Sequence, residues 1–326
     1  MPGWPALLGA VLAVVALVAP LPTASAGPLG FDLQAHRGGR GETTEESLRA
    51  FAKSLELGVS TLELDIVITE DGQPLVWHDP TIEPEKCADT VPAFAGDPQY
   101  PYVGKLVHDL TLLQIRTLDC GRRLAEFPDA EVVRGNKIAT LPEVFALTDS
   151  YRADVRYNIE TKVAADKPGT SADPQQFVDV ILAAVRSAGK VDRVEIQSFD
   201  WRTLPMVHWA EPSIPLVALY NDETWAPDSL WLADESSGVI GDPMIGAKLV
   251  GANIISPRYT LVDGKSYVDH AHWLGLKVIP WTVNDAATMR EQIADGVDGL
   301  ITDYPTVLRG VLAELGMPLP PVYHRS

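Results

Sequence analysis

The chain has 326 residues, a formal net charge of −18 at pH 7 and only two cysteines. Such an acidic surface disfavours nucleic acid as a partner, and it also disfavours electrostatic docking on anionic membranes. The length is sufficient for one large α/β domain or for two small ones.

Residues 1–26 have the features of a secretory signal peptide. An apolar run from Leu7 to Val18 is followed by the small residues Ala24-Ser25-Ala26, which are typical of a cleavage site. The run is short for a bilayer span, and prolines interrupt the sequence that follows it. We therefore expect residues 27–326 to form a secreted, extracellular protein with no stable membrane span. The alternative is an uncleaved anchor helix.

After this segment, short apolar runs that are typical of strands alternate with helical patterns. The predicted strands are 32–36, 61–68, 155–160, 194–198, 216–220, 253–256, 277–281 and 299–302. The predicted helices are 45–57, 141–148, 174–188, 200–210, 262–274 and 286–294. Eight such repeats with apolar strands predict an α/β fold of the (β/α)8 TIM barrel type. A doubly wound open sheet is the competing fold, but no glycine-rich dinucleotide fingerprint follows the first strand.

Residues 81–137 interrupt this alternation. The segment is rich in Pro, Gly and Asp and is too long for an ordinary barrel loop, so we expect an inserted subdomain after the second strand. Both cysteines, Cys87 and Cys120, lie within it. In an exported protein they most simply form one disulfide, whereas two free thiols are the alternative. The insertion either covers the site and selects substrates or is a surface excursion.

Three carboxylates lie on predicted strands. Glu63 and Asp65 are two residues apart, so both point to one face of the second strand, and Glu160 ends the third. Carboxylates that share one buried face repel each other, and a divalent cation would offset that cost. Oxygen ligands without cysteine favour Mg²⁺ or Ca²⁺ over zinc. A solvent-exposed edge with alternating charge is the alternative.

Two histidines and two cations accompany the carboxylates. His36 ends the first strand, and His78 closes a short extended run before Asp79. Because an imidazole titrates near neutrality, one ring can accept a proton while the other donates one. Arg37 and Lys162 are suited to gripping phosphate oxygens, although each could instead form a surface ion pair. Asp79 either orients His78 or caps the turn that follows.

Aromatic residues are predicted near the barrel mouth. Trp281, at the end of the seventh strand, could stack on a glycerol or choline-like group, or it could be a core residue. Trp225, Leu230 and Trp231 follow the fifth strand. They form either an apolar lip for an acyl or alkenyl chain or ordinary buried packing.

These motifs resemble, in order and over nearly the whole mature chain, those of the glycerophosphodiester phosphodiesterase family. The matching elements are His36-Arg37-Gly38, Glu45, Glu63-Leu64-Asp65, Asp71-Gly72, His78-Asp79, Glu160-Thr161-Lys162, Gln197-Ser198-Phe199, Pro280-Trp281-Thr282-Val283-Asn284 and Thr302-Asp303-Tyr304-Pro305. The resemblance implies a barrel with one divalent ion held by Glu63, Asp65 and Glu160. It implies that His36 and His78 are the acid–base pair, that Arg37 and Lys162 contact phosphate, and that Glu45 lies near the metal.

One departure concerns the sequence Thr44-Glu45-Glu46-Ser47, where the family usually has Pro-Glu-Asn-Thr. Glu46 thus replaces an amide with a carboxylate. We expect it either to recruit a different partner at the edge of the site or to select a cationic headgroup.

The expected function is that of a secreted, metal-dependent phosphodiesterase. It would hydrolyse glycerophosphodiesters, such as glycerophosphocholine or glycerophosphoethanolamine, to glycerol phosphate and an alcohol. One alternative is a lysophospholipase D that acts on lysophospholipids or lysoplasmalogens. A second alternative is a non-catalytic secreted binding barrel. We expect a monomer that recognises a small phosphodiester or a lysophospholipid.

Overall fold

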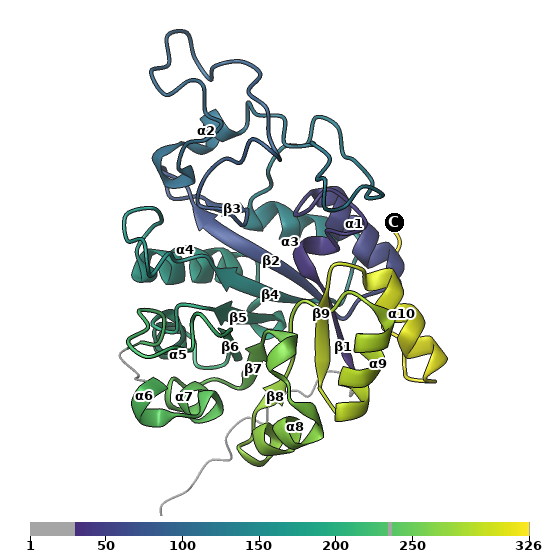
Figure 1. The fold of residues 1–326 in the computed structure, drawn as a ribbon. Coiled ribbons are helices and arrows are strands. Elements are labelled where there is room, and N and C mark those ends of the chain that lie inside the picture. The colour runs from purple at the N-terminus through teal and green to yellow at the C-terminus, as the bar shows by residue number, and fades with distance from the viewer. Residues whose placement is uncertain (1–29, 234–236, 326) are drawn as a thin grey trace, which may run out of the picture.

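The computed structural model describes residues 30–233 and 237–325 (Figure 1). The predicted signal peptide, residues 1–26, lies outside the described residues. None of the helices within these two ranges is both long and apolar enough to cross a membrane.

Eight parallel strands form a barrel, as the alternation of elements predicted. They are β1 (Asp32–Ala35), β2 (Thr61–Ile68), β4 (Arg156–Thr161), β5 (Val194–Ser198), β6 (Leu216–Tyr220), β7 (Ile254–Pro257), β8 (Lys277–Val278) and β9 (Gly299–Thr302). Their order is β8-β7-β6-β5-β4-β2-β1-β9. Backbone hydrogen bonds from Asp298 to Val278 (2.9 Å) and from Ile301 to Pro280 (3.1 Å) join β9 to the β8 segment and close the barrel.

Helices surround the strands (Figure 1). Those predicted are observed as α1 (Leu48–Leu57), α3 (Leu141–Ser150), α4 (Pro174–Ser187), α5 (Thr203–Ala210), α8 (Gly264–Trp273) and α9 (Ala286–Asp295). Four more were not predicted: α2 (Leu112–Ile115), α6 (Ser237–Ile240), α7 (Pro243–Leu249) and α10 (Pro305–Glu314). Helix α1 begins three residues later than predicted because the Ser47 hydroxyl caps it by accepting a hydrogen bond from the Ala50 N–H.

The two faces of the barrel strands differ in character. On β2, Leu62, Leu64, Ile66 and Ile68 are fully buried in the large core between barrel and helices. The intervening residues Glu63 and Asp65 are also buried and, by the period of two, face the barrel interior. Burying the outward apolar side chains stabilises the fold by about 1.5–3 kcal/mol each. The same pattern places both carboxylates inside.

The insertion follows β3 (Pro74–Val76), a short strand that pairs antiparallel with the end of β2. Figure 1 shows it as an extension beyond β3 at one end of the barrel. Its apolar side chains, among them Ile82, Tyr102 and Leu118, form a small second core together with Val67 of β2 and Leu75 of β3. Cys87 and Cys120 form a disulfide with an S–S distance of 2.07 Å. The predicted pairing is therefore present in the structure.

Candidate active site

A cavity of about 220 Å³ opens at the carboxyl ends of the barrel strands. Its lining includes seven of the predicted site residues: His36, Arg37, Glu63, His78, Glu160, Lys162 and Trp281. In a parallel barrel this end is where side chains from different strands converge. Residues that are up to 245 positions apart in the sequence therefore meet here. The strand topology, and not their proximity in the sequence, brings them together.

The three predicted metal ligands meet beside this cavity. Glu63 and Asp65 lie on one face of β2, and Asp65 is in register with Glu160 on β4. One carboxylate oxygen from each residue lies within 4.8 Å of the others, and all three side chains are buried. Burial and the neighbouring carboxylates raise the pKa of Glu63 well above its ordinary value. Burial likewise raises the pKa of Glu160 to about 7.

Asp65 behaves differently from its neighbours. Burial alone would raise its pKa, but Lys162 and Arg37 outweigh burial and hold the pKa of Asp65 below its ordinary value. The Arg37 Nε atom lies 3.1 Å from Asp65 Oδ2. When all three buried carboxylates are ionised, their negative charge exceeds the positive charge of Lys162 and Arg37, which is costly in a region of low dielectric. This donor set fits a hard divalent cation.

Arg37 and Lys162 both reach the cavity from positions beside the carboxylates. Arg37 follows β1 in a left-handed conformation, with φ of 50°, and its backbone N–H donates a 2.8 Å hydrogen bond to Glu63 Oε2. The Lys162 Nζ atom lies 2.7 Å from Glu160 Oε1 and 3.8 Å from Asp65 Oδ1. Both cations therefore lie where they could contact an anionic group that binds to a cation held by the carboxylates.

Each predicted catalytic histidine has a carboxylate partner. His36 Nδ1 lies 2.5 Å from Asp303 Oδ1, and the Asn284 amide donates to the other oxygen of Asp303 at 2.7 Å. Although burial opposes it, the contact with His36 holds the pKa of Asp303 below its ordinary value. His78 Nδ1 lies 2.8 Å from Asp79 Oδ1.

The environment of His78 favours its neutral form. Burial, together with the nearby charges of Lys162 and Arg37, lowers the pKa of His78 well below its ordinary value. The hydrogen bond to Asp79 takes Nδ1, so a neutral ring that donates through Nδ1 leaves Nε2 as an acceptor. Asp79 thus orients His78, which was one of the two roles expected for it.

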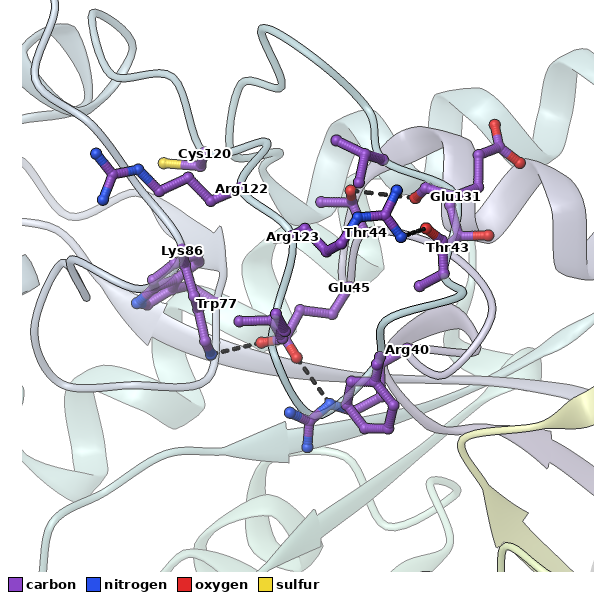
Figure 2. Close-up of a pocket in the computed structure, with 14 residues that line it drawn as sticks. Arg40, Thr43, Thr44, Glu45, Trp77, Lys86, Cys120, Arg122, Arg123 and Glu131 are labelled. Carbon is purple, nitrogen blue, oxygen red and sulfur yellow. Dashed lines mark hydrogen bonds and ion pairs between the residues drawn. The ribbon is translucent and has the colours of Figure 1, made fainter.

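Glu45 contacts cations rather than the carboxylate cluster. Its oxygens lie 3.4 Å from Arg37 Nη1 and 2.8 Å from Arg40 Nε, and Lys86 of the insertion also contacts it. Burial works against ionisation, but these three cations lower the pKa of Glu45 to about 2. Figure 2 shows Glu45 between Lys86 and Arg40. Glu45 is therefore the ionised centre of a cationic cluster.

Glu46 recruits a protein partner, which was one of the two roles expected for it, but it does so in the buried interior rather than at the edge of the site. Its side chain is only 2% exposed, and its Oε1 accepts a 2.9 Å hydrogen bond from the Asp65 backbone N–H. A left-handed backbone conformation, with φ of 54°, turns the residue inward. Glu46 therefore supports the strand that carries Asp65, and it is not among the described residues that line the cavity.

The predicted aromatic residues have different positions. Trp281 is partly buried, lines the cavity and packs edge-on against Phe199 at 5.3 Å between ring centroids. Trp225 packs against Trp201 and Tyr220, so it belongs to the core, whereas Leu230 is 63% exposed. Trp281 is thus positioned at the cavity, as one of its two readings expected.

Four residues acquire a place in the site that sequence reasoning did not give them. Arg40 lines the cavity and pairs with Glu45, and Lys86 of the insertion contacts the same Glu45 without lining the cavity. Gln197 donates to Glu63, and Asn284 to Asp303. Gln197 and Asn284 stood in recognised motifs without a role. Arg40 and Lys86 had no sequence signal, because a surface cation and a site cation look alike in a sequence.

Comparison with known proteins agrees with this geometry. A model of the "Glycerophosphoryl diester phosphodiesterase family" matches residues 36–307. A glycerophosphodiester phosphodiesterase of Caldanaerobacter subterraneus subsp. tengcongensis is 28% identical over 86% of this chain and 98% of that protein. A lysophospholipase D of Rattus norvegicus is 26% identical over 85% of this chain and 84% of that protein.

A solved structure is also similar. The crystal structure of a protein assigned as a glycerophosphoryl diester phosphodiesterase, from Silicibacter pomeroyi, has a TM-score of 0.75 and 28% identity. The match covers 89% of this chain and 95% of that one. Because the family model spans most of the sequence and includes both histidines and all three clustered carboxylates, the chain belongs to the glycerophosphoryl diester phosphodiesterase family, a family of phosphodiester hydrolases.

Proposed function

We propose that the protein is a secreted, metal-dependent phosphodiesterase that hydrolyses glycerophosphodiesters to glycerol phosphate and an alcohol. The observation that carries the proposal is the meeting, at one cavity, of three buried carboxylates with His36 and His78. Each histidine is held by its own carboxylate, and the two rings come from different strand ends. Such a site can move protons on both sides of a phosphorus atom.

The surroundings of the two histidines favour different roles, with His78 as the general base and His36 as the general acid. His78, which is neutral at physiological pH, would accept the proton of the attacking hydroxyl through Nε2. The nucleophile would be water, or it would be the 2-hydroxyl of the substrate's own glycerol. In the second case a cyclic phosphate forms first, and water then opens it to glycerol phosphate. As the new P–O bond forms, the bond to the alcohol breaks, and His36 would donate a proton to the departing oxygen. The Asp303 carboxylate would compensate the charge of the protonated His36 ring.

Positive charge around the phosphate completes the proposal. Arg37 and Lys162 would grip the non-bridging oxygens, whose charge increases in the transition state. A Mg²⁺ or Ca²⁺ ion held by Glu63, Asp65 and Glu160 would supply further charge stabilisation there. Trp281 would face the glycerol or the alcohol. Preformed charge of this kind is typically the largest single contribution to such catalysis.

The size of the cavity favours a substrate without an acyl chain. Pockets that hold drug-sized ligands are typically about 300–1,000 Å³, whereas this cavity is about 220 Å³. A lysophospholipase D activity is the second candidate, supported by the rat relative of that name and by the exposed Leu230 beyond β6. In that case the chain of a lysophospholipid would lie outside the cavity.

The deciding experiment is a comparison of alcohol release from two matched substrates. Glycerophosphocholine and the lysophospholipid with the same headgroup are each tested with Mg²⁺, with Ca²⁺ and with a chelator. We expect faster release from glycerophosphocholine and loss of release with chelator. Preference for the lysophospholipid would establish the second candidate. Activity that resists the chelator would refute the metal assignment, and no activity on either substrate would favour a binding barrel.

Secretion is tested separately. The full chain is expressed with residues 1–26 intact, and the mass of the protein in the medium is measured. We expect a protein that starts near residue 27. Retention of the full-length chain on the membrane would instead support the anchor alternative.

A further inference from the structure

Lys86 connects the insertion to the catalytic machinery. Its ammonium group contacts two carboxylates at once, Glu45 and Asp79. It also lies over the Trp77 ring, 4.9 Å from the ring centroid, and its side chain is only 12% exposed. Figure 2 shows the stacking on Trp77 and the contact with Glu45. Lys86 is therefore held on three sides.

The contact with Asp79 extends to a histidine. One oxygen of Asp79 contacts Lys86, and the other lies 2.8 Å from His78 Nδ1. A carboxylate with only the histidine as partner could rotate, whereas one fixed by a second charged group holds the imidazole in a single orientation. Lys86 thus acts on His78 through Asp79. The cavity that holds His36 and Glu63 is lined by His78 but not by Lys86 among its described lining residues, so Lys86 has no direct contact with substrate there.

The backbone at Lys86 is fixed by a second segment of the insertion. The Arg122 N–H donates to the Lys86 carbonyl at 3.2 Å, and Ala88 exchanges two backbone hydrogen bonds with Asp119. The Cys87–Cys120 disulfide lies between these contacts and is buried. The covalent link therefore joins the residue next to Lys86 to the segment against which Lys86 packs.

The pocket beside Lys86 does not offer an alternative role. It is lined by Trp77, Glu45, Arg40 and Phe127 and has a volume of about 20 Å³ (Figure 2). That is room for about one water molecule. The ammonium group of Lys86 contacts two carboxylates of the protein, so we expect it to hold these carboxylates rather than to bind a ligand in this pocket.

We propose that Lys86, anchored by the Cys87–Cys120 disulfide, is a positioning residue that fixes Asp79 and thereby orients His78 for catalysis. The insertion is then part of the active site, and the oxidised form of the insertion is needed for full activity. The inference rests on the proposed phosphodiesterase function. It also predicts an effect on the His78 ring that can be measured without turnover.

The first test compares Lys86→Met with Lys86→Arg, and with Lys265→Met as a matched control on an exposed helix position. We expect kcat for glycerophosphocholine to fall about 10- to 100-fold in Lys86→Met with little change in KM, because orientation rather than binding is lost. Lys86→Arg should recover most of the activity, since it retains the charge and the donors. The control should equal the wild type.

The second readout is the titration of His78, followed by NMR of the ring. The charged groups around His78 are Lys162, Arg37, Asp65, Asp79 and Lys86. Removing the Lys86 charge should raise the pKa of His78, and the acid limb of the rate profile should move to higher pH with it. Unchanged titration together with unchanged kcat would refute the inference. If the wild type is inactive but Lys86→Met still shifts the titration of His78, only the proposed function is refuted.

The disulfide is tested by non-additivity. Cys87→Ala/Cys120→Ala should lower kcat in the same way as Lys86→Met, and adding Lys86→Met to it should lower kcat no further. Circular dichroism verifies the fold of each variant. Additive losses would show that the disulfide does not act through Lys86. If the paired variant does not fold, the disulfide supports the whole domain, and its assigned role is overturned.

Discussion

The Gln197 side-chain amide donates a 2.6 Å hydrogen bond to Glu63 Oε1, inside the barrel. Glu63 Oε2 accepts from the Arg37 backbone N–H, so both oxygens of this buried carboxylate have defined partners. Gln197 in turn accepts from Asn158, which also donates to Gln34. A chain of buried side-chain amides inside the barrel therefore helps to fix the rotamer of Glu63.

This relationship predicts the effect of removing the amide. Gln197→Ala removes one of the two hydrogen bonds that hold Glu63, and loss of such a supporting partner typically costs about 10- to 100-fold in metal affinity. We expect weaker binding of Mg²⁺ or Ca²⁺ by that factor in a calorimetric titration. Gln175→Ala, on the exposed face of α4, is the matched control and should bind as the wild type does. Equal affinity in both variants would contradict the support role of Gln197.

Binding of a divalent cation should release protons near neutral pH. Without a cation, the pKa of Glu160 is about 7, so this carboxyl is protonated for part of the time near neutral pH, and burial also raises the pKa of the neighbouring Glu63. A cation requires the carboxylate forms and displaces those protons. The apparent binding enthalpy should therefore differ between buffers with different ionisation enthalpies, and the difference should shrink at pH 8.5. Identical enthalpies at pH 7 would show that the cluster is already ionised.

The two histidines should differ in their dependence on the leaving group. A nitrophenolate departs without a proton, whereas the choline alkoxide needs one. His36→Gln should therefore lose about 10²–10⁴-fold on glycerophosphocholine but much less on glycerophospho-p-nitrophenol. His78→Gln should lose activity on both substrates, because the attacking hydroxyl is the same. The reverse pattern would exchange the two roles.

The strands were predictable because the property that a barrel strand needs, a short apolar run, is visible in the local sequence. A strand that is buried on both faces needs an apolar run, and all eight runs became barrel strands. The seventh was predicted as 277–281, but its regular part ends at Val278, since Pro280 cannot donate a strand hydrogen bond. Helices α6 and α7 follow the loop after β6 and were not recognised, because both are short.

The site was predictable where its members lie on the barrel strands or follow closely after a strand. Glu63, Asp65 and Glu160 meet because strand register aligns them. Lys86 contacts Glu45 across 41 positions, through a segment that packs on the ends of β2 and β3 in the small second core. The buried position of Glu46 was not predicted because its left-handed backbone conformation depends on tertiary contacts, which the amino-acid sequence alone does not show.

Glu195 should make stability depend on pH. It is buried on β5, and burial together with Asp32 raises its pKa to about 7 from 4.5. Between these values the folded protein binds more protons than the unfolded chain, so the free energy of unfolding falls as pH rises from about 4.5 to about 7. Glu195→Gln keeps an oxygen that can accept the hydrogen bond from Gln34, and it removes the charge.

This variant should therefore be more stable than the wild type above pH 7, by on the order of 3–4 kcal/mol, since one pKa unit corresponds to about 1.4 kcal/mol. Below about pH 4.5 the two proteins should be alike. Urea unfolding at pH 4.5, 6 and 8 measures the difference, with Glu291→Gln on the exposed face of α9 as the control. A stability gain that is the same at all three pH values would mean that the amide packs better. The gain in stability would then not come from removal of the buried charge of Glu195. Removal of that charge produces a gain that grows as the pH rises toward the folded-state pKa of Glu195.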